Sequence, residues 1–270
     1  MHRSLLGASA TLALGMALVA APAGAQNAAE TCPDNGRAPI QAPSTGGNSS
    51  GTEQNDRFNG SAGDDTISLL QGEDCAVGGA GFDTINGGAG RDILYGQGGP
   101  DDLSGGSEDD RIFGGDGFDF IVGGIGDDDL FGQEGPDDIS GSNGDDEIDG
   151  GGGFDFISGG LGDDRLEGGD DRDDIEGGLG RDRIEGGDGS DRIAGGLGGD
   201  RLIGGDGNDR IDGGDGRNTY SGGNGNDQID AANGSKETIN CGAGKDVVRA
   251  DATDRLRNCE RVFRLRLIRR

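Results

Sequence analysis

Histidine, tryptophan and tyrosine are nearly absent from this chain of 270 residues, which contains one His, no Trp and two Tyr. The single histidine is His2, so the chain has no HExxH zinc-protease motif and no histidine to activate a serine or cysteine nucleophile. Paired carboxylates such as Asp101 and Asp102 are the residue type that a glycosidase uses. They belong to the repeat described below, and no stretch of sequence remains for a catalytic domain. We therefore expect no enzyme activity.

Hydrophobic residues are also scarce, at 30% of the chain, whereas glycine contributes 62 residues. Acidic residues outnumber basic residues by 52 to 23, which gives a formal net charge of −29. Such a composition is typical of disordered proteins, although the order of the residues argues against disorder here. The strong negative charge makes nucleic acid an unsuitable partner.

The segment that ends at Ala25 differs in kind from the rest of the chain. A basic start is followed by an apolar run from Leu5 to Ala20 and by small residues up to Ala25, which is typical of a secretory signal peptide. We expect cleavage after Ala25, a secreted, extracellular protein and no membrane span, because the apolar run is short for one. A retained membrane anchor is the alternative.

Four cysteines occur in the chain, at Cys32, Cys75, Cys241 and Cys259. In an exported protein they indicate two disulfides, and four cysteines allow three pairings. We favour Cys241 with Cys259, which both lie in the C-terminal segment, and this leaves Cys32 with Cys75. A zinc site is the alternative, but no CxxC spacing or neighbouring histidine supports it.

A nine-residue repeat dominates the sequence. An apolar residue preceded two positions earlier by Asp recurs through 20 consecutive slots, from Asp56 with Phe58 to Asp227 with Ile229. Asn218 fills the one slot that lacks Asp. Eleven slots carry the complete string Gly-Gly-x-Gly-x-Asp, as in GGAGFD at residues 78–83. A flexible acidic linker is the alternative, but a linker needs no such register.

This string resembles the nonapeptide GG-x-G-x-D-x-U-x, with U apolar, of the repeat-in-toxin (RTX) family, whose hemolysin-type calcium-binding repeats also occur in serralysin-like proteases. The glycines favour a tight six-residue turn, and x-U-x suits a short strand with U facing inward. Two such units make one coil of turn, strand, turn and strand.

The resemblance implies an all-β fold, a right-handed parallel β-roll (a β-solenoid) of about ten coils over residues 53–230. Residues 26–52 would form a linker or N-terminal cap. Residues 231–270 would form a degenerate repeat and a basic C-terminal cap pinned by a disulfide.

Carboxylates and turn carbonyls are hard oxygen ligands, which match Ca2+ rather than a transition metal. By resemblance to the family, each ion lies between two successive turns on one edge of the roll. The Asp56 edge carries Asp56, Asp74, Asp92, Asp110, Asp128, Asp146, Asp164, Asp182 and Asp200. The Asp65 edge carries Asp65, Asp83, Asp101, Asp119, Asp137, Asp155, Asp173, Asp191, Asp209 and Asp227. We expect on the order of 15 to 18 calcium ions, with a weaker site at Asn218.

The fold should depend on these ions, because one coil buries only two apolar side chains while all of its backbone loses conformational freedom. Binding of calcium would then supply free energy of folding. We expect a largely disordered chain in chelator and a secreted calcium-binding protein that folds on binding.

Phenylalanines recur at every fourth repeat unit, at Phe82, Phe118 and Phe154 on the Asp65 edge. At normal strand spacing they would lie about 9 to 10 Å apart. We favour recent duplication with packing between turns as the explanation of this pattern. A strip for a cell-surface or self-association partner is the alternative, so a calcium-dependent adhesin or structural module is the alternative function.

Overall fold

The computed structural model describes residues 32, 40–41 and 46–265. The predicted signal peptide, its cleavage after Ala25, and most of the predicted linker lie outside the described residues. Within the described part, the secondary structure consists of strands and turns. No helix suited to crossing a membrane is found among the described residues.

Two parallel sheets make up the fold, and successive strands alternate between them. The first sheet contains, in spatial order, β1 (Ile40–Gln41), β3 (Arg57–Asn59), β5 (Cys75–Ala80), β7 (Ile93–Gly98), β9 (Arg111–Asp116), β11 (Asp129–Glu134), β13 (Glu147–Gly152), β15 (Arg165–Asp170), β17 (Arg183–Asp188), β19 (Arg201–Asp206), β22 (Thr219–Asn224), β24 (Thr238–Ala243) and β26 (Arg255–Arg257). The second contains β2 (Gly47–Ser50), β4 (Asp65–Ser68), β6 (Thr84–Ala89), β8 (Asp102–Ser107), β10 (Phe120–Ile125), β12 (Asp138–Asn143), β14 (Phe156–Leu161), β16 (Asp174–Gly180), β18 (Arg192–Gly198), β20 (Arg210–Asp212), β23 (Gln228–Ala231), β25 (Val247–Asp251) and β27 (Arg261–Leu265), with β21 (Asp215–Gly216) paired to β18.

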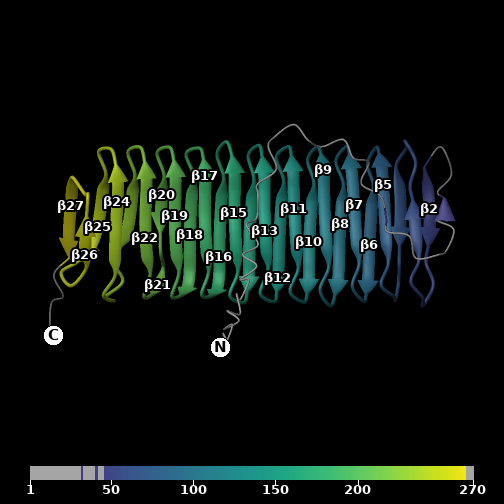
Figure 1. Cartoon of the computed structure of the whole chain (residues 1–270), viewed down its shortest axis with the longest axis horizontal. Coiled ribbons are helices and arrows are strands. Elements are labelled where there is room, and N and C mark those ends of the chain that lie inside the picture. Colours follow the sequence, from purple (N-terminus) through teal and green to yellow (C-terminus); the bar gives the residue numbers. More distant parts are fainter. Residues whose placement is uncertain (1–31, 33–39, 42–45, 266–270) are drawn as a thin grey trace, which may run out of the picture. The chain divides into compact units, whose positions relative to one another are not determined.

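Each strand pairs with the strand one coil further along the chain, so the coils stack in order from β2 to β27 (Figure 1). Ile121 of β10, for example, lies opposite Ile139 of β12, two repeat units later in the chain. This register follows from the repeat, because two nine-residue units return the chain to the same sheet. The predicted parallel β-roll is therefore confirmed as a parallel β-solenoid.

The number of coils differs from the prediction, being about 12 rather than about ten. The additional coils come from β1 and β2 before residue 53 and from β24, β25, β26 and β27 after residue 230. Backbone pairing needs only the register, so segments without the full Gly and Asp motif still add strands.

The strands are longer than expected. In the regular coils a strand has six residues, as in Phe120–Ile125, and only three residues, Gly-x-Asp, separate it from the next strand. The two leading glycines thus belong largely to the strand, since Gly124 pairs with Gly106 on one side and Ser142 on the other. The predicted six-residue turn was wrong in its extent.

The core is the column of U residues between the sheets. Ile112, Ile121 and Leu130 are 0% exposed, and every U residue of the predicted register is buried. Their neighbours on either side along the strand face outward, as Phe120 does. The interior is thus thin, with one apolar side chain for each nine-residue unit.

The two disulfides have the predicted pairing, Cys32 with Cys75 and Cys241 with Cys259. The first joins Cys32 to strand β5 across a sequence separation of 43 residues. The second spans a sequence separation of 18, which places its cysteines in neighbouring coils, so it fastens the last coil to the preceding one.

Some turns lack a glycine of the motif but keep its conformation. Leu70 and Gln133, which replace the second glycine, have φ angles of 78° and 80°. Glu108 and Asp171, which replace the third glycine, have φ angles of 71° and 72°. The coil geometry therefore imposes a left-handed backbone on residues that do not favour it.

Candidate metal centre

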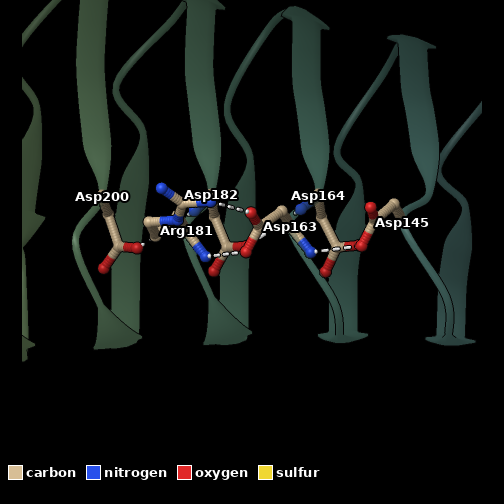
Figure 2. Close-up of polar contacts among 6 residues, drawn as sticks. All are labelled: Asp145, Asp163, Asp164, Arg181, Asp182 and Asp200. Atoms are coloured by element: carbon tan, nitrogen blue, oxygen red, sulfur yellow. Dashed lines mark hydrogen bonds and ion pairs between the residues drawn. The ribbon is translucent and has the colours of Figure 1, made fainter.

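A ladder of buried aspartates runs along each edge of the roll. Apart from Asp65, which begins β4, the slot residues end a turn and directly precede a strand, as Asp137 precedes β12. One carboxylate oxygen, Oδ1, accepts a hydrogen bond from the backbone N–H of the slot residue one coil earlier. The N–H of Asp119 thus donates to Oδ1 of Asp137, and the N–H of Asp101 to Oδ1 of Asp119, both at 2.8 Å. Figure 2 shows three members of the Asp56 edge: Asp164, Asp182 and Asp200.

The other oxygen of these carboxylates has no protein partner. Oδ2 is buried and makes no hydrogen bond at Asp83, Asp92, Asp101, Asp110, Asp119, Asp128, Asp137, Asp146, Asp155, Asp164, Asp173, Asp182, Asp191, Asp200, Asp209, Asp227 and Asp246. At Asp65 the unpaired oxygen is Oδ1, because Oδ2 accepts from Ser61. Asp56 instead directs Oδ2 at Thr52. A buried carboxylate oxygen without a partner is costly, so a row of them indicates sites for a cation.

The first glycine of each motif provides the space for this oxygen. A Cβ atom added at Gly114 would lie 2.5 Å from Oδ2 of Asp119 and 2.8 Å from the carbonyl oxygen of Gly132. At Gly177 the corresponding distances are 2.5 Å to Asp182 Oδ2 and 2.6 Å to the Gly195 carbonyl oxygen. A carboxylate oxygen and a carbonyl oxygen of the next coil therefore converge beside the same glycine. A Cβ atom at Gly114 or Gly177 would therefore lie too close to both oxygens.

These donors suit calcium, since every one is a hard oxygen atom. No group of three or more His, Cys, Asp or Glu side chains converges on one point within the described residues. That agrees with the ladder geometry, because successive carboxylates on one edge are one strand spacing apart, about 4.8 Å. At most two carboxylates flank each space between turns, and backbone carbonyls must supply the remaining ligands. The residues present thus fit a calcium ion.

The aspartates of the ladder resist ionisation when no cation lies beside them. Burial raises the pKa of Asp110 and of Asp137 from 3.8 to about 8. The backbone N–H donor lowers the pKa of each, but adjacent carboxylates of the same ladder raise it again. Burial likewise raises the pKa of Asp92, Asp101 and Asp146 to about 7. A cation at Oδ2 would restore the charged form.

A second row of side chains lies outside the ladder and was not predicted. It consists of the residues that directly precede the slots, and its hydrogen bonds run in the opposite direction. The N–H of Asp163 donates to Oδ1 of Asp145 at 2.8 Å, and the N–H of Arg181 donates to Oδ1 of Asp163 at 2.8 Å (Figure 2). The Arg181 backbone N–H and guanidinium lower the pKa of Asp163. This exposed row ties neighbouring turns together without enclosing a site.

Acidic residues beyond the predicted boundary continue both ladders. The N–H of Asp227 donates to Oδ1 of Asp246 at 3.0 Å, and the N–H of Asn218 donates to Oε1 of Glu237 at 3.0 Å. The string CGAGKD at residues 241–246 was the sequence signal for Asp246. Glu237 follows a one-residue insertion in the register, and its signal in the sequence is the apolar Ile239 two positions later.

Asn218 takes a different orientation from the one expected of a ligand. Its Oδ1 accepts from the N–H of Asp200 at 2.8 Å, as a ladder aspartate would. Its other atom is the amide nitrogen Nδ2, which donates to the carbonyl oxygen of Gly213 at 2.9 Å. The atom that faces the ion space at other slots is therefore a hydrogen-bond donor here.

Comparison with known families agrees with this geometry. The family model described as the RTX calcium-binding nonapeptide repeat matches residues 50–75, 72–103, 104–139, 140–175, 167–202 and 195–229, which together exceed half of the chain. No curated protein compared with the chain matches it. The matched segments cover both aspartate ladders up to Asp227.

Proposed function

The chain belongs to the RTX calcium-binding nonapeptide repeat family, and we propose that it is a secreted calcium-binding protein whose roll folds as its turns take up a ladder of Ca2+ ions. The observation that carries the proposal is the buried, unpartnered Oδ2 atom in coil after coil on both edges. RTX repeats arranged in a β-roll imply calcium binding. Secretion and folding on binding go beyond that implication.

Folding on binding follows from where the stabilising contacts lie. The core contributes one apolar side chain for each unit, and the ladder buries a carboxylate in each unit as well. Bringing these carboxylates together without a cation is unfavourable, because burial and mutual repulsion both oppose ionisation. A Ca2+ ion at Oδ2 supplies the missing positive charge, so its binding free energy becomes folding free energy.

Secretion is supported by two features of the chain. Residues 1–25 have the composition of a secretory signal peptide. The two disulfides, Cys32 with Cys75 and Cys241 with Cys259, are bonds that persist in oxidising compartments outside the cytosol. We propose a role in binding rather than catalysis, in line with the lack of any histidine after His2.

A calcium titration of the chain starting at Gln26 tests the proposal. The protein is stripped of divalent ions, and far-UV circular dichroism is followed while CaCl2 or MgCl2 is added. We expect a cooperative gain of β signal with Ca2+ and little response to Mg2+, which demands a tighter octahedral site. Native mass spectrometry should count on the order of 15 to 18 ions. A β signal that is the same before and after ion removal contradicts folding on binding.

The phenylalanines of the Asp65 edge support a second candidate, a calcium-dependent adhesin or structural module. Phe82, Phe118 and Phe154 are 49%, 52% and 37% exposed. Phe154 packs edge-on against Phe156 with ring centroids 4.7 Å apart, and the Arg172 guanidinium lies 5.7 Å from its ring. Phe82 and Phe118 have no aromatic partner of this kind among the described residues.

Other outward rings pack on one another instead. Phe113 stacks between Tyr95 and Phe131, with centroid distances of 4.9 Å on both sides, so this row stabilises its own sheet. Sedimentation in calcium of the wild type and of F82S/F118S separates the candidates. Self-association that the variant loses supports the strip as a contact surface. A wild type that is monomeric, and that does not bind cells in calcium, removes this second candidate.

A further inference from the structure

One position of the Asp56 edge is built differently from all the regular ones. At a regular slot, the space beside the first glycine receives Oδ2 of the slot aspartate, as Gly114 receives Asp119. At Gly213 the same space contains the hydroxyl of Tyr220, and Asn218 Nδ2 lies 2.7 Å from the position of a Cβ there. Two hydrogen-bonding groups of the protein therefore occupy the place where carboxylate and carbonyl oxygens converge elsewhere.

The groups at this position satisfy one another. Asn218 Nδ2 donates to the Gly213 carbonyl oxygen at 2.9 Å and lies 3.4 Å from the Tyr220 hydroxyl, within hydrogen-bonding distance. Asn218 and Tyr220 are 1% and 2% exposed, so water does not compete. Tyr220 occupies a U position, where the regular coils have Ile or Leu, and its added hydroxyl is what reaches the glycine. An N–H donor repels a cation, and the phenol fills the volume.

The Asp65 edge keeps its geometry at the same level of the roll and beyond. Oδ2 of Asp209, Asp227 and Asp246 is buried and unpartnered. Beside Gly222, Oδ2 of Asp227 converges with the carbonyl oxygen of Cys241, which is the arrangement of the regular slots. Asp246 is 0% exposed and caps the N–H of Asp227 through Oδ1. Residues 241–246 lie outside the segments that the family model matches.

We propose that the two edges carry ion ladders of different length. The run of sites on the Asp56 edge is interrupted after Asp200, because Asn218 and Tyr220 form an ion-free plug in the next position, before the carboxylate ladder resumes at Glu237 with a buried, unpartnered Oε2. The Asp65 edge continues to a further calcium site between the turns of Asp227 and Asp246. The inference rests on the proposed function, since it takes the regular slots as calcium sites.

The plug has a consequence for the calcium-free protein. Beside Gly213 on the Asp56 edge, the neutral groups of Asn218 and Tyr220 fill the place that elsewhere holds a carboxylate in need of an ion, and Glu237 one coil later is the buried carboxylate that remains. The Cys241–Cys259 disulfide fastens the adjoining coils. These coils should therefore stay ordered when calcium is removed, while the coils of residues 100–200 open.

Counting bound ions by native mass spectrometry tests the ladder ends in the full chain from Gln26. N218A should bind as many ions as the wild type, because Asn218 is not a ligand. D246N should bind one fewer, whereas the control D212N, which changes an exposed aspartate, should bind the wild-type number. Loss of an ion in N218A, or a wild-type count in D246N, overturns the proposal. A wild type that binds no calcium would instead refute the proposed function.

Hydrogen exchange in calcium-free buffer provides a readout that does not depend on the count. Backbone amides of residues 213–240 should remain protected in the wild type. N218D, which places an uncompensated carboxylate in the plug, should lose this protection and recover it with calcium. The control N208D makes the same chemical change on an exposed residue and should behave as the wild type. Equal exchange of all coils in the ion-free wild type overturns the plug.

Discussion

The two oxygens of a ladder aspartate have different tasks. In the residues from Asp83 to Asp227 that retain Asp, one oxygen accepts a backbone N–H of the previous coil, and the other is left to the ion space. Asparagine preserves the first task, as Asn218 shows, but replaces the second oxygen with a donor. The identity of the slot residue therefore matters for the ion more than for the backbone pairing.

Asp137 and Asp138 allow this division to be tested with one charge change. Asp137 is 0% exposed and belongs to the ladder, whereas Asp138 is exposed on β12. We expect D137N to keep the backbone hydrogen bond, to bind at least one calcium ion fewer and to melt at lower temperature in calcium. D138N should match the wild type in both respects. Native mass spectrometry and thermal unfolding at saturating calcium provide the measurements, and equal ion counts for the two variants would contradict the assignment.

The leading glycine of a slot is needed for space rather than for its backbone conformation. A Cβ at Gly177 would lie 2.5 Å from Asp182 Oδ2, whereas at Gly199 the nearest atom is 3.4 Å away. We expect G177A to destabilise the calcium-bound roll by about 1 to 3 kcal/mol through overpacking. G199A should be close to neutral. Urea unfolding in calcium distinguishes them, and comparable midpoints would show that the space is not filled.

At the scale of the element, the two leading glycines of the motif belong largely to the strand and not to the turn that the motif predicts. Six residues pair as strand, and three residues reverse the chain. The second glycine pairs within the sheet while holding a positive φ, as Gly124 does at 121°. Left-handed backbone is thus a property of the coil, and residues other than glycine at this position carry strain.

Leu70 makes that strain measurable. It holds a φ of 78° and is 47% exposed, so replacing its side chain removes little packing. We expect L70G to stabilise the roll by about 1 kcal/mol, because the left-handed penalty of an L-residue disappears. L197G changes a similarly exposed leucine whose φ is not left-handed, and it should destabilise by about 0.5 to 1 kcal/mol. Thermal unfolding in calcium decides, and a lower melting temperature for L70G would exclude strain at this position.

At the scale of the whole molecule, electrostatics couples the ladders to pH and to calcium. The chain has a formal net charge of −29, and many of its carboxylates are buried side by side in the two ladders. Protons and calcium ions are the two means of relieving that repulsion. They compete for the same oxygens, so acid should stabilise the ion-free roll and weaken calcium binding.

The pH dependence of the ion-free chain follows from the raised pKa values. The pKa values of Asp110 and Asp137 rise from 3.8 to about 8 on folding. Between these two pH values the folded roll therefore holds protons that the unfolded chain has released. Their contribution to stability is complete below about pH 4 and is lost as the pH rises toward about 8. We expect more β signal at pH 4.5 than at pH 8 when calcium has been removed on a chelating resin. Circular dichroism measures this, and a stronger β signal at pH 8 would contradict the expected sign.

The sequence alone determined the register, the buried U residues and the spacing of the ladder aspartates, and it favoured the observed cysteine pairing. All of these depend on the covalent distance between residues, because a strict nine-residue step returns equivalent positions to the same edge. The family resemblance added the roll and its calcium. The nine-residue spacing does not determine how long each strand is.

Only the tertiary structure decided how side-chain atoms are directed between coils. The division of work between the two carboxylate oxygens, the outer row at Asp145 and Asp163, and the plug at Asn218 and Tyr220 are contacts between stacked coils or between the atoms that stacking confines. The same holds for the coils added beyond residues 53–230, where pairing persists although the motif fades. Spacing places a residue on an edge, but the direction of its atoms depends on the neighbours that stacking brings into contact.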